Sequence, residues 1–192
     1  MQATTISYTN MHSFGDLFPS LLRERWAAIY ARKSHQPTSQ DVPEYDQYDT
    51  PASRWIAVHQ EGHVLAGVRL TPTVHRVGPY TYMAKDAQDG LLVMPDDMLY
   101  DPAPVADDIW EASRVFINRT AATQKHREIY AHLMREMLKA ATAQQARRVL
   151  AMLPASWPRW TADVPARFTP AGPVSLVDGQ RRQYVFVDLK DS

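Results

Sequence analysis

The chain of 192 residues contains no cysteine, and that absence removes several kinds of chemistry at once. Disulfide bonds, thiolate nucleophiles and zinc sites with cysteine ligands are excluded. Long apolar runs are also absent, since none approaches the roughly 20 residues that a membrane-spanning helix needs. The first residues show no basic stretch followed by an apolar run, so we predict no secretory signal. A cytoplasmic location, with no membrane partner, is the default expectation.

The chain also carries no net charge, because its 21 basic and 21 acidic side chains balance. A balanced chain gives no global electrostatic argument for binding nucleic acid, and we expect no nucleic-acid partner. The composition is otherwise that of a globular protein, with 45% hydrophobic and 22% charged residues. Its length suits one domain with a substantial core.

Hydrophobic periodicity and turn residues predict mixed secondary structure. Pro19 is expected to break the first helix near its start, and Thr123 is the expected N-cap of the clearest helix. The predicted elements, in chain order, are a helix over about 14–33, a hairpin turning at Glu61-Gly62, a short helix within 85–106, a strand over about 108–117, a helix after Thr123, a strand over 147–153, a short helix within 156–168 and a hairpin turning at Asp178-Gly179. This order predicts one mixed sheet with helices packed on it, an α+β domain.

The segment DDIWEASRVFIN, from Asp107 to Asn118, places two opposite charges inside an apolar strand. Its other residues favour a buried strand, yet Glu111 and Arg114 lie in the middle of it. Removing a charge from water is costly unless the charge is paired. These two side chains therefore form a structural pair or await a charged ligand.

Four further charges belong with this pair. Arg69 interrupts an apolar strand in the same way, Arg25 lies on the first predicted helix, and Asp46 and Asp49 end a polar loop. Carboxylates can hold an ammonium group and arginines can hold a carboxylate, so such a set can bind a zwitterion. Each charge is also compatible with surface exposure or with an ion pair, and the residues alone leave both interpretations open.

Three segments in order resemble the LuxI-type acyl-homoserine-lactone synthases, the autoinducer synthases of bacterial quorum sensing. The family pattern is an E-x-D-x-x-D loop, an R-L-x-P-T strand and a W-E-x-S-R strand, with an arginine on the first helix. The matching segments are EYDQYD over 44–49, VRLTPT over 68–73, IWEASR over 109–114 and, on the helix, Arg25. The resemblance covers roughly 22–118, while the C-terminal third matches only in its order of helix, strand and hairpin.

The resemblance implies a GNAT-like acyltransferase fold, an α/β/α sandwich with a mixed, mostly antiparallel sheet flanked by helices. It implies one domain over 1–192, with a mobile N-terminal cap and acidic loop over 1–50 and a sheet core over 51–192. The implied reaction joins S-adenosylmethionine to an acyl group from a thioester, on acyl carrier protein or coenzyme A. The methionine amine attacks the thioester, and the carboxylate then closes the lactone and expels methylthioadenosine. S-adenosylmethionine is a substrate here, and no cofactor is expected.

The resemblance also suggests roles for individual residues. Glu111 is expected to accept the amine proton, and Arg114 to hold Glu111 and Asp46 ionised. Backbone amides near Val115 and Phe116 are expected to stabilise the oxyanion. The expected S-adenosylmethionine-binding residues are Arg25, Tyr30, Asp46, Asp49 and Arg69. The expected acyl pocket, between the late strand and the helix before it, comprises Ser113, Leu150, Met152, Leu153 and Trp157, with Met134 and Leu138 from the helix.

The sequence departs from the family pattern at two positions. Ile29 and His35 stand where the family has aromatic residues over the S-adenosylmethionine site. Three alternatives are open: Tyr30 or Trp26 replaces them with a shift of register, Tyr45 or Tyr48 covers the adenine, or the substrate differs. The Gly-rich acetyl-CoA loop of ordinary GNAT enzymes is missing from NRTAATQKHRE, which favours a carrier-protein donor. Basic residues suited to an acidic carrier protein are Lys139, Arg147 and Arg148.

Two other functions remain open. The chain can be a GNAT-like N-acyltransferase that uses acyl-CoA on another amine, which the replaced aromatic residues favour. It can also be a catalytically inactive relative that serves as a binding module, although a dead site has no need for buried charges. The HQEGH stretch contains His59 and His63 but is predicted to turn as a hairpin, so no metal site is expected there.

Overall fold

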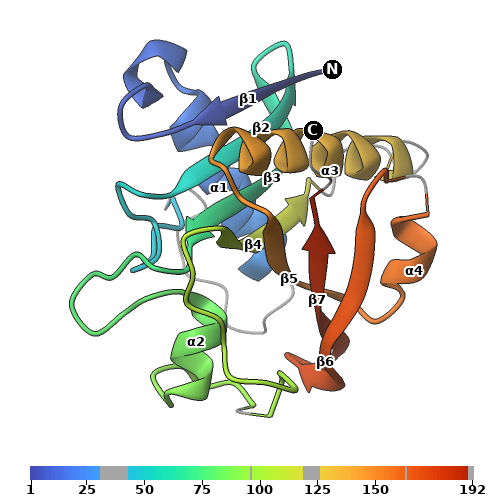
Figure 1. The fold of residues 1–192 in the computed structure, drawn as a ribbon. Helices are drawn as coiled ribbons and strands as arrows, with labels where there is room; N and C mark the ends of the chain where they lie inside the picture. The colour runs from blue at the N-terminus through green and yellow to red at the C-terminus, as the bar shows by residue number, and fades with distance from the viewer. Residues whose placement is uncertain (31–42, 96, 119–125, 163, 190–192) are drawn as a thin grey trace.

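The computed structural model describes residues 1–30, 43–95, 97–118, 126–162 and 164–189. In chain order the elements are β1 (Gln2–Ile6), η1 (Met11–Phe14), α1 (Leu17–Tyr30), β2 (Arg54–Gln60), β3 (His63–Pro72), α2 (Met83–Gln88), β4 (Ile109–Ile117), α3 (His126–Ala143), β5 (Arg148–Pro154), α4 (Trp157–Trp160), β6 (Arg167–Val177) and β7 (Gln180–Asp188). Figure 1 shows the strands side by side with the helices around them.

The strands form one seven-stranded sheet in the order β1-β2-β3-β4-β5-β7-β6. Only β4 and β5 run parallel, and their pairing extends from Ile109 opposite Arg148 to Ala112 opposite Ala151. Beyond Ala112 the end of β4 is paired only with β3. The predicted mixed and mostly antiparallel sheet is confirmed.

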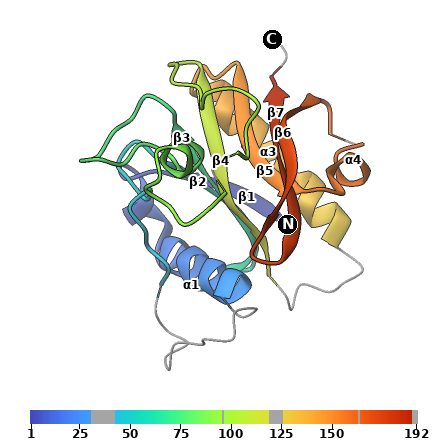
Figure 2. The ribbon, with the colours of Figure 1, turned by 90° about the horizontal axis from the view of Figure 1, so that it is seen from below.

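The helices lie on both faces of this sheet (Figure 2). The apolar face of α3 packs against alternate residues of β2, β3 and β4, such as Val58, Val68 and Ala112. On the other face, α1 packs on Trp55, Ala57 and Phe116. The close approach of α1 requires Gly67, because a Cβ there would lie 2.5 Å from Cδ1 of Leu21.

A β-bulge in β4 sets which side chains face α1. Arg69 pairs with Ser113 and Gly67 with Phe116, so two residues of β4, Arg114 and Val115, stand opposite one residue of β3. Arg114 has a backbone φ of 55°, the left-handed conformation that such an extra residue can adopt. The bulge reverses the alternation of β4, and this places both Ser113 and Phe116 on the face that carries α1.

The connection from β3 to β4 carries α2 and crosses the same face of the sheet as α1. Its far end is fixed on β6, where the Tyr100 N–H donates to the carbonyl of Ala171 at 2.9 Å. Gly172 makes that contact possible, since a Cβ on this residue would lie 1.8 Å from the carbonyl oxygen of Met98. The connection is thereby held against the sheet at both ends.

Most of the predicted elements are confirmed, although their first and last residues differ from the predicted ones. The hairpin turns at Glu61-Gly62 and Asp178-Gly179 adopt positive φ. Pro19 does not break the first helix, since it lies within the first turn of α1, where its missing N–H has no intrahelical partner to lose. The strand β1 was not predicted. Thr123 and residues 31–33 lie outside the described residues. No described helix is long and apolar enough to cross a membrane.

Candidate functional site

Arg25 connects α1 to the loop that follows residue 42. It is 2% exposed, and its guanidinium donates to both carboxylate oxygens of Asp49, at 3.0 and 2.6 Å. Its Nε lies 2.6 Å from the carboxylate of Glu44. A bidentate arginine–carboxylate pair of this kind fixes geometry as well as charge. The arginine therefore ties the acidic loop to the helix.

Asp49 is the centre of the buried ion pairs. Its carboxylate also accepts the indole N–H of Trp55 at 2.7 Å and lies 3.1 Å from NH1 of Arg69. Burial alone would raise the pKa of Asp49, but the hydrogen bonds from Arg25 and the charge of Arg69 outweigh it and hold that pKa well below its usual range. Asp49 is thus ionised and fully committed within the protein.

Asp46 joins the two arginines of the sheet. One of its oxygens accepts from Arg69, and the other accepts from Nε and NH2 of Arg114, at 3.1 and 2.9 Å. Arg114 also lies 3.0 Å from Glu44. The side chains of Asp46 and Arg114 are 13% and 22% exposed, whereas that of Arg69 is fully buried. Asp46 and Arg114 therefore form the side of the network that solvent reaches.

Glu111 lies beside this network and is held in a different way. It is 1% exposed, and its two oxygens accept the backbone N–H groups of Met83 at 3.0 Å and Ala84 at 2.9 Å. Burial raises the pKa of Glu111 to about 7, against the opposing effects of these two amides and of Arg69. Near neutral pH this carboxyl group exchanges protons readily, which is what a general base needs.

Asp86 is a second buried carboxylate near Glu111, and it lies on α2. It is fully buried and accepts the hydroxyl of Tyr48 at 2.8 Å and the hydroxyl of Thr81 at 2.7 Å. Its charge also contributes to the raised pKa of Glu111. Neither Asp86 nor Glu111 forms an ion pair within the described ranges, whereas the neighbouring network balances three carboxylates with three arginines.

Glu111 and Arg114, the two charges inside the predicted strand, have separate partners in the structure. Arg25, Arg69 and Asp49 are buried in structural ion pairs. Arg114 pairs with Asp46, as expected, while the oxygens of Glu111 are held by α2. Sequence reasoning missed the part played by Glu44, although its acidic loop was noted. It also missed Asp86, which no motif marks.

The expected acyl-pocket residues divide between the two faces of the sheet. Leu150 and Met152 belong to an apolar cluster on the Glu111 face, together with Tyr82 and Tyr184. Leu153 and Trp157 belong to the core beneath α3, where Met134 and Leu138 also lie. The Ser113 hydroxyl accepts a hydrogen bond from Nε of Arg69 at 3.1 Å, which places it beside the ion pairs.

Several predicted residues lack a described environment or have local partners. The side chain of Tyr30 and all of His35 lie outside the described part of the chain. Among the predicted basic residues, Lys139 pairs with Glu136 at 2.7 Å and Arg148 with Asp188 at 2.9 Å. These partners are compatible with a carrier-protein surface but do not require one.

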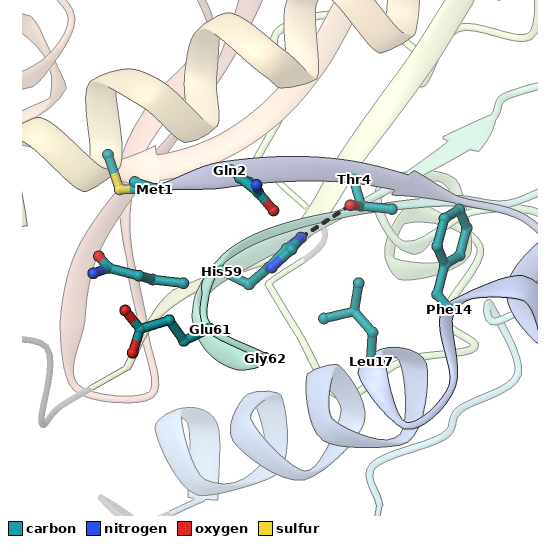
Figure 3. A pocket seen from close by; sticks show the side chains of 9 residues that line it. Met1, Gln2, Thr4, Phe14, Leu17, His59, Glu61 and Gly62 are labelled. Atoms are coloured by element: carbon teal, nitrogen blue, oxygen red, sulfur yellow. Dashed lines mark hydrogen bonds between the residues drawn. The ribbon is translucent and has the colours of Figure 1, made fainter.

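A separate hollow lies at the β2–β3 hairpin, away from Glu111 (Figure 3). It has a volume of about 670 Å³, with Phe14 and Leu17 on one side and the hairpin tip on the other. His59 turns toward β1, and its Nε2 lies 3.0 Å from the hydroxyl of Thr4. Glu61 is the one carboxylate in its lining, so this hollow lacks the charge constellation that the motifs predicted.

Comparisons with known proteins support the fold and the motifs. No known protein-family model matches the chain. An acyl-homoserine-lactone synthase from Vibrio anguillarum is 29% identical over 108 residues, which is 56% of this chain and 50% of the relative. The match therefore spans about half the length of that curated relative.

Solved structures match over nearly the whole chain. The crystal structure of TofI in a ternary complex with an inhibitor and MTA has a TM-score of 0.78 at 19% identity, covering 99% of this chain and 92% of TofI. The CoA-dependent acyl-homoserine lactone synthase BjaI, with SAM and isopentyl-CoA, has a TM-score of 0.73 at 19% identity, covering 97% of this chain and 82% of BjaI. An acyl-CoA N-acyltransferase from Pseudomonas aeruginosa has a TM-score of 0.60 at 15% identity, covering 96% and 97%.

The sheet and its flanking helices thus define a GNAT-like acyltransferase fold. Within that fold, the chain is similar in sequence to an acyl-homoserine-lactone synthase over about half of its length, and its three motifs resemble those of the LuxI-type synthases.

Proposed function

We propose that this protein is an acyl-homoserine-lactone synthase that makes a quorum-sensing signal in the cytoplasm. It transfers an acyl group from a thioester to the amine of S-adenosylmethionine, then closes the lactone and releases methylthioadenosine. The observation that carries this proposal is a buried carboxyl group, Glu111, with a pKa near 7 beside a charge-balanced cluster of arginines and carboxylates. That cluster lies in a fold shared with BjaI, whose structure contains SAM and isopentyl-CoA.

The charges of the site suit this substrate. S-adenosylmethionine carries an ammonium and a sulfonium group, and both are attracted to carboxylates that lack arginine partners. Glu111 and Asp86 are such carboxylates. The substrate carboxylate is suited to Arg114, which is the most exposed of the three clustered arginines. Arg25, Arg69 and Asp49 act by holding the acidic loop in place, because their ion pairs are buried away from solvent.

The reaction then requires a proton acceptor and an oxyanion site. Glu111 takes the proton from the ammonium group, and the neutral amine attacks the thioester carbonyl. The new N–C bond forms as the C–S bond breaks, and the nitrogen gives its second proton to the sulfur, which leaves as a thiol. Backbone N–H groups near Val115 and Phe116 are suited to the oxyanion, since β4 has no neighbour on its β5 side beyond Ala112. The substrate carboxylate closes the lactone in a second step.

The acyl donor is a thioester of acyl carrier protein or coenzyme A. BjaI and MesI are described as CoA-dependent, which supports coenzyme A for this fold. The missing Gly-rich loop supports a carrier protein. An acyl chain held on the Glu111 face would contact Leu150 and Met152.

Methylthioadenosine release from S-adenosylmethionine tests the proposal, with a panel of carrier-protein and coenzyme A thioesters. We expect release coupled to formation of an acyl-homoserine lactone, detected by mass spectrometry. Glu111→Gln should lower the turnover number at least about a hundredfold, as expected for loss of a general base. Glu136→Gln, a surface change on α3, should leave it unchanged. A wild-type protein that releases no methylthioadenosine with any thioester would overturn the assignment.

A second candidate is an N-acyltransferase that acts on another amine with acyl-CoA. The replacement of the expected aromatic residues by Ile29 and His35, together with the fold match to an acyl-CoA N-acyltransferase, favours it. Acyl transfer from coenzyme A without methylthioadenosine release would select this function. Binding of S-adenosylmethionine without turnover on any thioester would instead select an inactive binding module.

A further inference from the structure

Thr71 carries a buried hydroxyl group that has no hydrogen-bond partner among the described residues. The residue is fully buried near the C-terminal end of β3. A buried polar group left unpaired costs about 1–3 kcal/mol, and the few that occur in native proteins have a specific cause. The family pattern R-L-x-P-T leaves this position open, so the motif does not account for a threonine here.

The register of the sheet places this hydroxyl beside Glu111. Thr71 stands directly opposite Glu111 in the β3–β4 pair. Its neighbour Leu70 joins the core beneath α3, so the Thr71 side chain lies on the other face, where Glu111 meets α2. Side chains directly opposite in an antiparallel pair have Cβ atoms about 4.5–5.5 Å apart.

Thr73, in the turn just after β3, is a threonine whose hydroxyl has a structural role. Its hydroxyl lies 2.9 Å from the carbonyl oxygens of Ala106 and Ile109 and accepts the N–H of Ala106 at 3.1 Å. It thereby fixes the end of the α2 connection to β3. Thr71, two residues earlier, has the same side chain without such partners among the described residues, so we expect its hydroxyl to serve a group that is not part of the protein.

We propose that Thr71 is a positioning residue for proton transfer: its hydroxyl binds a water molecule that also contacts Glu111, and the amine proton reaches the carboxylate through that water. This inference rests on the proposed function. The pairing of Thr71 with Glu111 places the two side chains next to each other on one face of the sheet, within the reach of one bridging water. The ammonium loses one proton to the water, the water gives one to Glu111, and the carboxylate becomes a neutral acid.

Other groups also act on Glu111, and a change at Thr71 leaves them in place. Arg69 of β3 lowers the pKa of Glu111, as do the two backbone amides of α2, while Asp86 of α2 raises it. Tyr184 of β7 also interacts with the charge of Glu111. Loss of the bridging water removes a donor that stabilises the ionised carboxylate, so the pKa of Glu111 rises further. The acid limb of the pH–rate profile, which reports the ionisation of the base, then moves to higher pH.

The test compares Thr71→Val, which removes only the hydroxyl, with Thr71→Ser, which keeps it. For Thr71→Val we expect the turnover number to fall about tenfold to a hundredfold, with KM for S-adenosylmethionine within about twofold, because a general-base pathway is impaired while binding is kept. The acid limb should move to higher pH, and Thr71→Ser should restore both. The thermal midpoint of Thr71→Val should not fall, because the lost hydroxyl makes no hydrogen bond to another described part of the protein.

Thr73→Val is the matched control, and it should lower the thermal midpoint without moving the acid limb. Wild-type turnover and an unmoved pH profile in Thr71→Val would overturn the proposal, as would loss of activity together with loss of stability in both Thr71 variants. Infrared titration of the Glu111 carboxyl band, assigned with Glu111→Gln, reads the same shift without substrate. A wild-type protein inactive on all thioesters would therefore overturn the proposed function, while an unmoved band in Thr71→Val would overturn this inference.

Discussion

Single residues of the site fall into two groups, those that hold the acidic loop and those that set the properties of Glu111. The first group comprises side chains whose charges are already paired, such as Arg25 and Asp49. The second includes Asp86, which raises the pKa of Glu111 and belongs to none of the three motifs. We expect the two groups to respond differently to mutation, because only the second acts on the proposed proton acceptor.

Asp86→Asn should lower the pKa of Glu111, because it removes a buried negative charge that disfavours ionisation. The acid limb of the pH–rate profile should move to lower pH, by about one unit at most. Stability should also fall, since an amide cannot accept all the hydrogen bonds from Thr81 and Tyr48. Asp89→Asn, on an exposed carboxylate that pairs with Lys85, is the control and should leave the limb in place. A shift to higher pH would contradict the electrostatic role.

At this scale the sequence predicts which charges matter but not how they are paired. Charges in an apolar strand are conspicuous, so Glu111, Arg114 and Arg69 are found readily. The partner of Glu111 is a pair of backbone amides in a short helix, and backbone donors leave no trace in the residue types. Asp86 is equally hidden, because the segment around it shows neither an apolar strand nor a family motif.

Among the elements, the connection between β3 and β4 depends on one close contact. Gly172 of β6 lies against the carbonyl of Met98, and a backbone atom cannot move aside as a side chain can. Gly172→Ala should therefore destabilise the protein by about 1–3 kcal/mol, measured by urea unfolding. Hydrogen exchange should increase over residues 97–103. Leu176→Ala, on an exposed residue of the same strand, should change the free energy of unfolding by less than about 0.5 kcal/mol. Equal stability of the two variants would contradict the contact.

Elements with a strong local signal were predictable, and those that depend on distant partners were not. The two hairpins were found because Gly62 and Gly179 occupy positions that require positive φ. The long helix was found from its apolar face. In contrast, β1 is a short edge strand whose register depends on β2, and its residues show no clear alternation of burial. The bulge in β4 also leaves no local signal, since it depends on the register with β3.

For the whole molecule, two buried carboxyl groups predict how stability depends on pH. The pKa of Glu111 is about 7 in the folded protein, above the 4.5 of an exposed glutamate, so the folded state binds the extra proton between these values. Its contribution is therefore full below about pH 4.5 and lost as pH rises through 7. Asp49 acts in the opposite sense, because its pKa is lowered, and its contribution is lost as pH falls below the ordinary value of 3.8.

The free energy of unfolding should consequently fall between about pH 5 and 8, by on the order of 1–3 kcal/mol. Glu111→Gln should be less stable overall, because an amide can accept only one of the two backbone N–H groups. It should nevertheless lack this decline, so the two stability curves should converge as pH rises. Urea unfolding at a series of pH values measures both curves, and parallel curves would contradict the raised pKa.

The bulge in β4 has a consequence for how this site can change during evolution. Arg114 is the extra residue of that bulge, so it carries a side chain of the site without occupying a place in the alternation of the strand. The residues on either side, Ser113 and Val115, keep their faces whatever side chain stands at 114. If Arg114 contacts the substrate as proposed, ligand contacts and core packing are encoded at separate positions, and a change of specificity at residue 114 would leave both layers around β4 in place.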